Sequence, residues 1–213
     1  WAEALTKEVY ETWRNKFNFW QSGFKIFYSP IKANPKVLII GHNPGGDGKS
    51  FIVDKEKFEN GDFSLPKKHE YITQNYAIAK KMRDFFKDNK ELLETGVKLN
   101  LIFFRSKDLK QWNSIQTSER LKMEKFCYEK LRIIVETLKP KVILVEGLRT
   151  YDILEKILGK FSYKSHIKRN NSRIVSTSRL NNTIVIGIIH PSGSRISNGD
   201  WEKIKFVFYQ NLK

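Results

Sequence analysis

The chain has 213 residues, 40% of them hydrophobic, which suits one globular domain with a full core. Its 39 lysine and arginine residues outnumber its 23 acidic residues and give a formal net charge of +16. A single cysteine excludes an intramolecular disulfide framework, and no apolar run approaches the ~20 residues of a membrane span.

The excess of positive charge indicates a polyanionic partner, because charge on this scale favours association with nucleic acid. A proteome that is rich in lysine would give the same composition, so charge supports this interpretation without establishing it. The N-terminal segment carries Glu3, Lys7 and Glu8 and does not resemble a signal peptide. We therefore expect an intracellular, monomeric protein with a polyanionic partner, for which single- or double-stranded DNA is a candidate, and with no membrane partner.

Helical and strand patterns alternate along the chain. Apolar residues at spacings of three and four predict a helix over 3–20, and a buried strand follows at 37–40. The next elements are a helix over 75–87, a strand over 97–104, a helix over 119–138 that ends before Pro140, a strand at 142–145 and a helix over 150–158. Two strands at 173–178 and 183–189, joined by a turn at 181–182, precede a last helix over 201–212.

Strands that alternate with helices predict an α/β protein with parallel strands and right-handed crossovers. We expect three layers, α/β/α, around a central, mostly parallel four-stranded sheet. The sequence has no internal repeat, low-complexity tract or linker, so residues 1–213 are expected to form one domain.

Two short loops carry most of the functional information. The first, Gly41-His42-Asn43-Pro44-Gly45-Gly46, follows the strand at 37–40, and the second, His190-Pro191-Ser192-Gly193-Ser194, follows the aliphatic run at 184–189. Both loops should open at the carboxyl edge of one sheet, which is where open α/β sheets bind ligands.

The pair of loops resembles the two signature motifs of the uracil-DNA glycosylase superfamily. In that superfamily a G-x-[DN]-P-G type loop positions water and an H-P-S type loop stabilises the departing base. Asn43 makes the chain similar to the single-strand-selective and mismatch-specific families, since the main uracil glycosylase family carries Asp there. Because Cys127 alone cannot hold a four-cysteine iron–sulfur cluster, the resemblance implies a cluster-free branch with no cofactor or metal.

The resemblance implies catalytic roles for Asn43 and His190. The Asn43 amide would orient the attacking water and favour the positive charge that develops on the sugar, but it cannot accept the water's proton as a carboxylate would. A neutral His190 would donate a hydrogen bond to the leaving pyrimidine. The simpler alternatives are a strand-to-loop turn at Pro44 and a buried histidine that is satisfied by the backbone.

The resemblance also implies contacts with the base and with the DNA backbone. Asn100, a lone amide in an apolar strand, would meet N3–H and O4 of uracil, or would be a satisfied structural asparagine. Glu56 stands near the place where the family has a stacking aromatic, and Phe51 is the nearby aromatic that we favour for that role. The remaining expected contacts are His42 with the base and Gly45, Ser192, Gly193, Ser194 and Arg195 with DNA; Arg195 or Ile196 would fill the space of the flipped nucleotide.

The function that these features predict is a monofunctional DNA glycosylase of base-excision repair. It would hydrolyse the N-glycosidic bond of a flipped uracil or related pyrimidine and leave an abasic site. A Schiff-base lyase is not implied, because no lysine lies in the matched motifs, although Lys49 is close to the first.

Three alternatives stay open. The base could be a bulky modified one, from damage or from modified viral DNA, or the chain could be a DNA-binding member of the fold without turnover. The string Gly48-Lys49-Ser50 and the acid Glu146 also suggest a phosphate-loop hydrolase, but Asn43 stands where that loop needs glycine and Pro44 removes a backbone amide.

Overall fold

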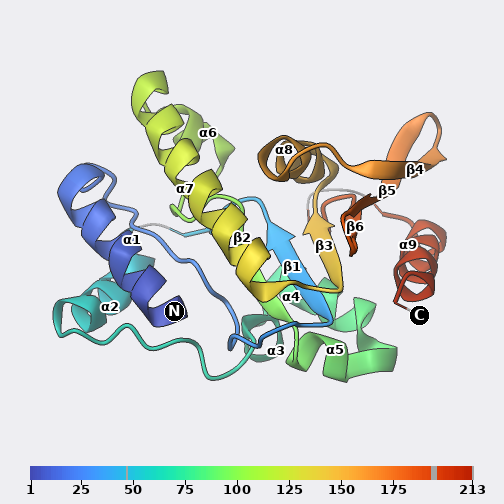
Figure 1. Ribbon diagram of the computed structural model, residues 1–213, viewed down its shortest axis with the longest axis horizontal. Helices are drawn as coiled ribbons and strands as arrows, with labels where there is room; N and C mark the ends of the chain where they lie inside the picture. The colour runs from blue at the N-terminus through green and yellow to red at the C-terminus, as the bar shows by residue number, and fades with distance from the viewer. Residues whose placement is uncertain (47, 193–195, 213) are drawn as a thin grey trace.

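The computed structural model describes residues 1–46, 48–192 and 196–212 and is an α/β structure. In this part of the chain six strands form one mixed sheet in the order β2-β1-β3-β6-β5-β4 (Figure 1). The strands are β1 (Val37–Gly41), β2 (Val97–Asn100), β3 (Val142–Glu146), β4 (Ser162–Arg169), β5 (Ser172–Leu180) and β6 (Thr183–Ile188).

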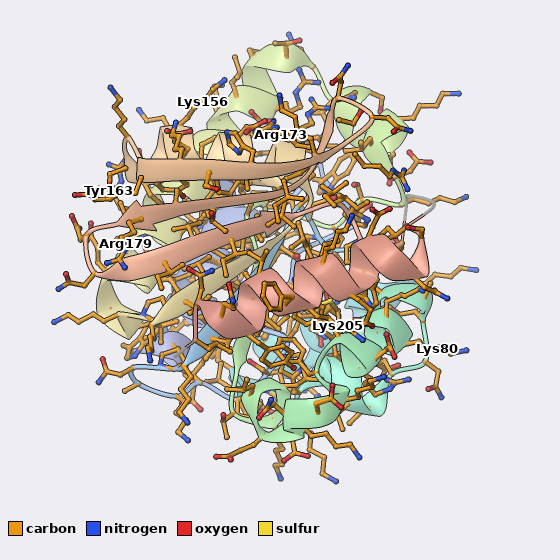
Figure 2. The ribbon with its side chains drawn as sticks, turned by 90° about the vertical axis from the view of Figure 1, so that its right-hand side faces the viewer. Lys80, Lys156, Tyr163, Arg173, Arg179 and Lys205 are labelled. Carbon is orange, nitrogen blue, oxygen red and sulfur yellow. The ribbon has the colours of Figure 1, made fainter. Side chains whose placement is uncertain are left out.

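The expectation of a four-stranded sheet is wrong, because the sheet continues beyond β6. Strands β2, β1, β3 and β6 pair in parallel, and β5 and β4 add antiparallel pairs at one edge. Strand β4 was not predicted from the sequence, because almost all of its residues are exposed and charged or polar, as is common at sheet edges, and no apolar alternation marks it. Figure 2 shows this edge, where Tyr163 of β4 is 84% exposed.

Helices pack on both faces of the sheet (Figure 1). One face carries α1 (Ala2–Lys16), α2 (Gly48–Glu59), α6 (Leu109–Asn113), α7 (Thr117–Leu138) and α8 (Leu148–Leu158). The other carries α3 (Glu70–Thr73), α4 (Ala77–Phe85), the 3₁₀ turn η1 (Lys87–Asn89), α5 (Lys90–Glu94) and α9 (Asn198–Gln210). None of the helices in the described residues combines the length and the apolar composition of a membrane span.

The central strands are apolar on both sides, which explains their unbroken aliphatic sequences. In β1, Leu38 and Ile40 face the core under α1 and α7, whereas Val37 and Ile39 face the core under α4 and α9. Alternation of side chains along each strand therefore builds two separate cores on one sheet.

The parallel strands end together at one edge of the sheet. Gly41 at the end of β1 is paired with Asn100 at the end of β2, and Glu146 at the end of β3 is paired with Ile188 at the end of β6. The predicted strand 97–104 stops at Asn100, because the next backbone N–H groups donate to carbonyls of the first loop, beginning with Leu101 to Gly41 at 2.9 Å. The residues of the candidate site lie at this edge.

Candidate active site

A pocket of about 380 Å³ opens at the carboxyl edge of the parallel strands. Its walls come from the first loop, from the ends of β2 and β3, from His190 beyond β6 and from α3 with the turn that follows it. The lining residues that the sequence analysis predicted are His42, Asn43, Gly45, Asn100 and His190. With Tyr28, which precedes β1, residues from six separate parts of the chain meet in one cavity.

Asn43 is held by a side chain from the segment after β2. Its Nδ2 donates to Ser106 Oγ, and its second hydrogen bond within the described residues, to the Pro44 carbonyl, also leaves from Nδ2. This arrangement leaves Oδ1 as the atom that can accept a hydrogen bond from a water.

The nearly buried side chain of Arg105 braces the same loop. Its Nη1 donates to the Gly45 carbonyl at 3.1 Å, and its Nη2 pairs with Asp54 of α2 at 3.2 Å. The loop is thus fixed to two neighbouring elements, which limits its movement around a bound ligand.

His190 is arranged as a neutral hydrogen-bond donor. The Ser192 backbone N–H donates to His190 Nδ1 at 3.4 Å, and Ser192 Oγ lies 3.2 Å from the same nitrogen. Because a backbone N–H can only donate, Nδ1 accepts and the ring proton sits on Nε2. Burial lowers the pKa of His190 below 6.5 and Lys98 acts in the same direction, while Glu146 opposes them.

The floor of the pocket contains a buried ammonium group. Lys98 is 3% exposed, and its Nζ lies 2.9 Å from the Leu99 carbonyl, 3.0 Å from Asn100 Oδ1 and 3.2 Å from Glu146 Oε2. An ammonium has three donors, so these three partners satisfy it. Burial lowers the pKa of Lys98, and the Glu146 carboxylate counteracts this shift by favouring the charged form.

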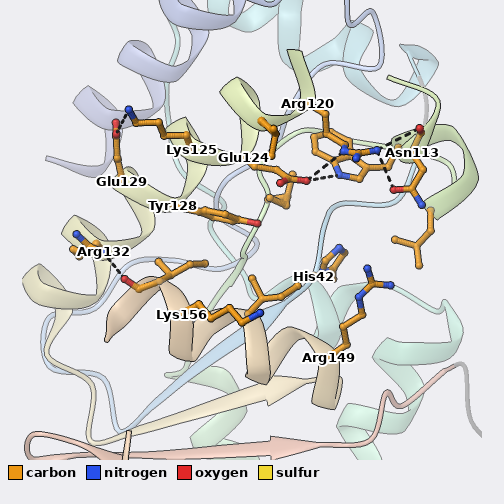
Figure 3. Close-up of a pocket in the computed structure, with 16 residues that line it drawn as sticks. His42, Asn113, Arg120, Glu124, Lys125, Tyr128, Glu129, Arg132, Arg149 and Lys156 are labelled. Atoms are coloured by element: carbon orange, nitrogen blue, oxygen red, sulfur yellow. Dashed lines mark hydrogen bonds and ion pairs between the residues drawn. The ribbon is translucent and has the colours of Figure 1, made fainter. Parts of the chain in front are cut away.

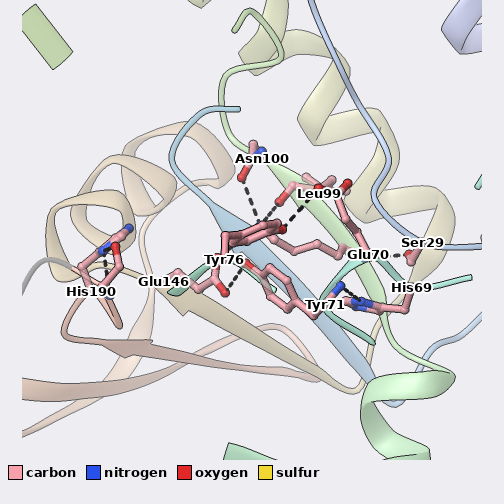
Figure 4. A network of polar contacts seen from close by, with 11 residues as sticks. Ser29, His69, Glu70, Tyr71, Tyr76, Leu99, Asn100, Glu146 and His190 are labelled. Atoms are coloured by element: carbon pink, nitrogen blue, oxygen red, sulfur yellow. Dashed lines mark hydrogen bonds and ion pairs between the residues drawn. The ribbon is translucent and has the colours of Figure 1, made fainter. Parts of the chain in front are cut away.

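Glu146 completes the floor from the end of β3. Its side chain is 2% exposed, and Tyr71 OH donates to its carboxylate, at 2.6 Å from Oε1 and 2.8 Å from Oε2. Burial, reinforced by the Glu146 charge, raises the pKa of Tyr71 well above 10 and keeps the phenol protonated. Figure 4 shows this network, with His190 beside it.

Gly41 makes room for the network. A Cβ atom at this position would lie 2.3 Å from Asn100 Oδ1, 2.7 Å from Lys98 Nζ and 3.0 Å from Glu146 Oε2. Any side chain on Gly41 would therefore occupy the point where β2 and β3 bring these polar groups together.

Lys98 also fixes the orientation of Asn100. Because Asn100 Oδ1 accepts from Lys98 Nζ, the amide group turns its Nδ2 donor away from the ammonium. Both ends of this amide were expected to contact a base, whereas its oxygen accepts a hydrogen bond from Lys98. Nδ2 is the end that remains to donate to a ligand.

Tyrosines supply the aromatic lining. Tyr28 and Tyr71 are buried in the wall, and Tyr76 is 41% exposed. Tyr76 OH donates to Glu70 Oε1 at 3.3 Å, and Lys25 pairs with Glu70 Oε2 at 2.8 Å. The hydroxyl of Tyr28 is buried, and burial raises its pKa while the neighbouring Asn100 side chain acts in the opposite direction, so the phenol stays protonated beside Asn100.

Phe51 lies elsewhere. Its side chain is 2% exposed and packs against Trp13 and Phe24 in the core between α1 and α2, with ring centroids 5.0 and 5.3 Å away. It does not line the pocket, and Tyr76 is the partly exposed aromatic that does. Ser192 contacts His190 rather than the cavity, and the expected DNA contacts Gly193, Ser194 and Arg195 lie outside the described residues.

Several pocket residues were not predicted from the sequence, chiefly Lys98, Tyr71 and Arg105. Lys98 carried a usable signal, since a charged residue in a four-residue buried strand needs a buried partner. Glu146, which ends another buried strand, was noticed without a role, and the pairing of these two charges is what the sequence alone did not show. Tyr71 had no comparable signal because it comes from a four-residue helix.

A comparison with models of known protein families finds no match to this chain, and a comparison with curated proteins finds none either.

The buried pair makes a prediction for stability. Lys98→Met leaves Glu146 charged and uncompensated, and we expect the free energy of unfolding to fall by roughly 3–5 kcal/mol. In Lys98→Met/Glu146→Gln no buried charge remains, so the double variant should be more stable than Lys98→Met alone. Urea denaturation of both single variants and the double variant measures the coupling. Additive losses in the double variant would show that the two groups do not depend on each other.

Proposed function

We propose that the protein is a DNA glycosylase that hydrolyses the N-glycosidic bond of a flipped pyrimidine, uracil or a related modified base. The observation that carries this proposal is the convergence of Asn43, Asn100 and His190 on one pocket of about 380 Å³. They come from three distant parts of the sequence, and each offers a polar group that the reaction requires. The net charge of +16 suits a DNA substrate.

Asn43 would direct the water. In the transition state the sugar gains positive charge as the base departs, and the Asn43 carbonyl oxygen both orients the water and favours that charge. The water oxygen bonds to C1′ while the electrons of the C1′–N bond leave with the base. The amide cannot take the released proton, which passes to solvent, so the chemistry is expected to be slower than with a carboxylate.

His190 would stabilise the leaving group. Its Nε2–H donor is fixed before the reaction, because Nδ1 is engaged by Ser192. A preorganised donor of this kind acts where the departing base accumulates negative charge and contributes about 10²–10³ in rate.

The floor would select the base. Asn100 Nδ2 offers a donor, and the Glu146 carboxylate retains acceptor capacity after its bonds with Lys98 and Tyr71. An adjacent donor and acceptor fit a base edge with a carbonyl next to an N–H, such as O4 and N3–H of uracil. Tyr76 is the aromatic that we place against the face of the base.

The phosphate-loop alternative is disfavoured by the position of Glu146. The acid that would hold a metal ion in such an enzyme is tied to Lys98 and Tyr71 in the floor of the pocket. A DNA-binding member without turnover and a glycosylase for a bulky base are distinguished from our proposal by the assay described next.

Excision should depend on Asn43 and His190. Oligonucleotides that carry uracil or one of a panel of modified bases are incubated with the protein, and abasic sites are cleaved by alkali. We expect alkali-labile strands for at least one pyrimidine, and a rate about 10²-fold lower in Asn43→Ala and in His190→Ala. Borohydride should trap no covalent complex, since the reaction uses water.

The outcomes of this assay separate the candidate functions. Release of a bulky base alone would favour the second substrate class. Absence of any excision with tight DNA binding would favour the non-catalytic member. Excision at the wild-type rate in both variants would refute the assigned roles.

The pH dependence of excision should follow His190. Burial lowers its pKa below 6.5, so the neutral ring predominates at and above that pH, and the rate should change little there. At lower pH, protonation of Nδ1 removes the acceptor for the Ser192 N–H and disturbs the loop, so the rate should fall. Single-turnover rates across this range provide the test, with His190→Ala as the control that lacks this step. A fall centred at or above pH 6.5 would contradict the argument.

A further inference from the structure

A second, larger cavity adjoins the candidate active site. It has a volume of about 720 Å³ and lies between α6, α7 and α8. Among the residues that the structure describes, His42 lines both cavities. Burial lowers the pKa of His42 to about 4, and the charges of Arg149 in the large cavity and His190 in the active site act in the same direction.

The larger cavity is rich in cationic side chains. Five cationic and two acidic residues line it within the described part of the chain. Glu124 is engaged by Arg120 at 3.7 Å and by Trp112 Nε1 at 3.3 Å, so its charge is already compensated. Arg132 donates to the Ile157 carbonyl. Figure 3 shows Arg149 and Lys156 on the α8 side of this cavity and Arg149 close to His42.

Arg149 and Lys156 are the exposed cationic side chains on the α8 side of this cavity. Both side chains are exposed, and neither makes an ion pair in the portion of the chain that the structure describes. They are seven residues apart on α8, which places them on one face of the helix about 10 Å apart along its axis. Leu109 and Leu121, 47% and 56% exposed, form an apolar rim on the opposite side.

We propose that this cavity binds the single-stranded segment of DNA next to the flipped nucleotide, with phosphates at Arg149 and Lys156. The cationic charge suits the backbone, and exposed Leu109 and Leu121 with the half-buried Tyr128 offer apolar surface to unstacked bases. Because His42 lines both cavities, the strand would pass this residue on its way from one cavity to the other. A mononucleotide would not need this connection, so a strand is the favoured occupant. This inference rests on the proposed function for the location of the flipped base.

The test measures binding of DNA that cannot be excised. Fluorescence anisotropy with oligothymidylates of increasing length gives the affinity at several salt concentrations for the wild type, Arg149→Ala, Lys156→Ala and the double variant. Each lost phosphate contact should flatten the dependence of log affinity on log salt by about 0.7. The double variant should bind on the order of tenfold more weakly at low salt.

A charge-matched control separates a local contact from loss of net charge. Lys36 is exposed and directly precedes β1, so it lies at the opposite edge of the sheet. Lys36→Ala should retain the wild-type slope, and thermal unfolding should show that all four variants are folded. An equal loss in Lys36→Ala, or a wild-type slope in the double variant, would overturn the inference.

Two further results keep this inference distinct from the proposed function. Thymidine monophosphate that competes as well as a long strand would show a mononucleotide site and overturn the strand path. Weaker strand binding in Arg149→Ala and Lys156→Ala, in a protein that excises no base, would support the strand path and refute the glycosylase. Normal excision with unchanged strand binding would refute the strand path alone.

Discussion

The ion pair between Lys98 and Glu146 is the constraint on which the pocket depends. Each group is almost completely buried, and transfer of an isolated charge from water to such a place is strongly unfavourable. The pair is tolerated because the Leu99 carbonyl and Asn100 satisfy the remaining donors of Lys98, and Tyr71 donates to the Glu146 carboxylate. Gly41, which lies between them on β1, leaves the space in which they meet.

In the proposed function, this pair would link the fold to the choice of base. Pairing of β1 with β2 places Gly41 opposite Asn100, two residues beyond Lys98, and pairing of β1 with β3 places Ile40 opposite Val145, directly before Glu146. The register of the sheet therefore sets the distances in the floor of the pocket. Lys98 then orients the Asn100 amide, and Tyr71 orients the Glu146 carboxylate. Because all these groups are hydrogen-bonded within the protein, they form a rigid template that a ligand must match.

Motifs of neighbouring residues could be recognised in the sequence, but pairs of residues that meet only in the folded chain could not. The aliphatic strands and the two loops that contain Asn43 and His190 are local features, so their positions at one sheet edge followed from the general geometry of α/β sheets. The partnership of Lys98 with Glu146 depends on strands that are 48 positions apart, and a single sequence carries no record of it. Phe51 was favoured as the stacking aromatic because of its position in the sequence. In the structure it lies on the side of α2 that packs into the core, away from the pocket. The exposed strand β4 was missed because its sequence lacks any buried face.

The claim that this floor reads a pyrimidine edge is tested most directly by NMR titration of the protein with free uracil and with 3-methyluracil. The account predicts that uracil shifts the side-chain amide resonances of Asn100 and the ring resonances of His190. Since 3-methyluracil has no N3–H to donate to Glu146, it should shift them much less at the same concentration. Equal shifts with both bases, or shifts by uracil that leave Asn100 and His190 unaffected, would contradict the account.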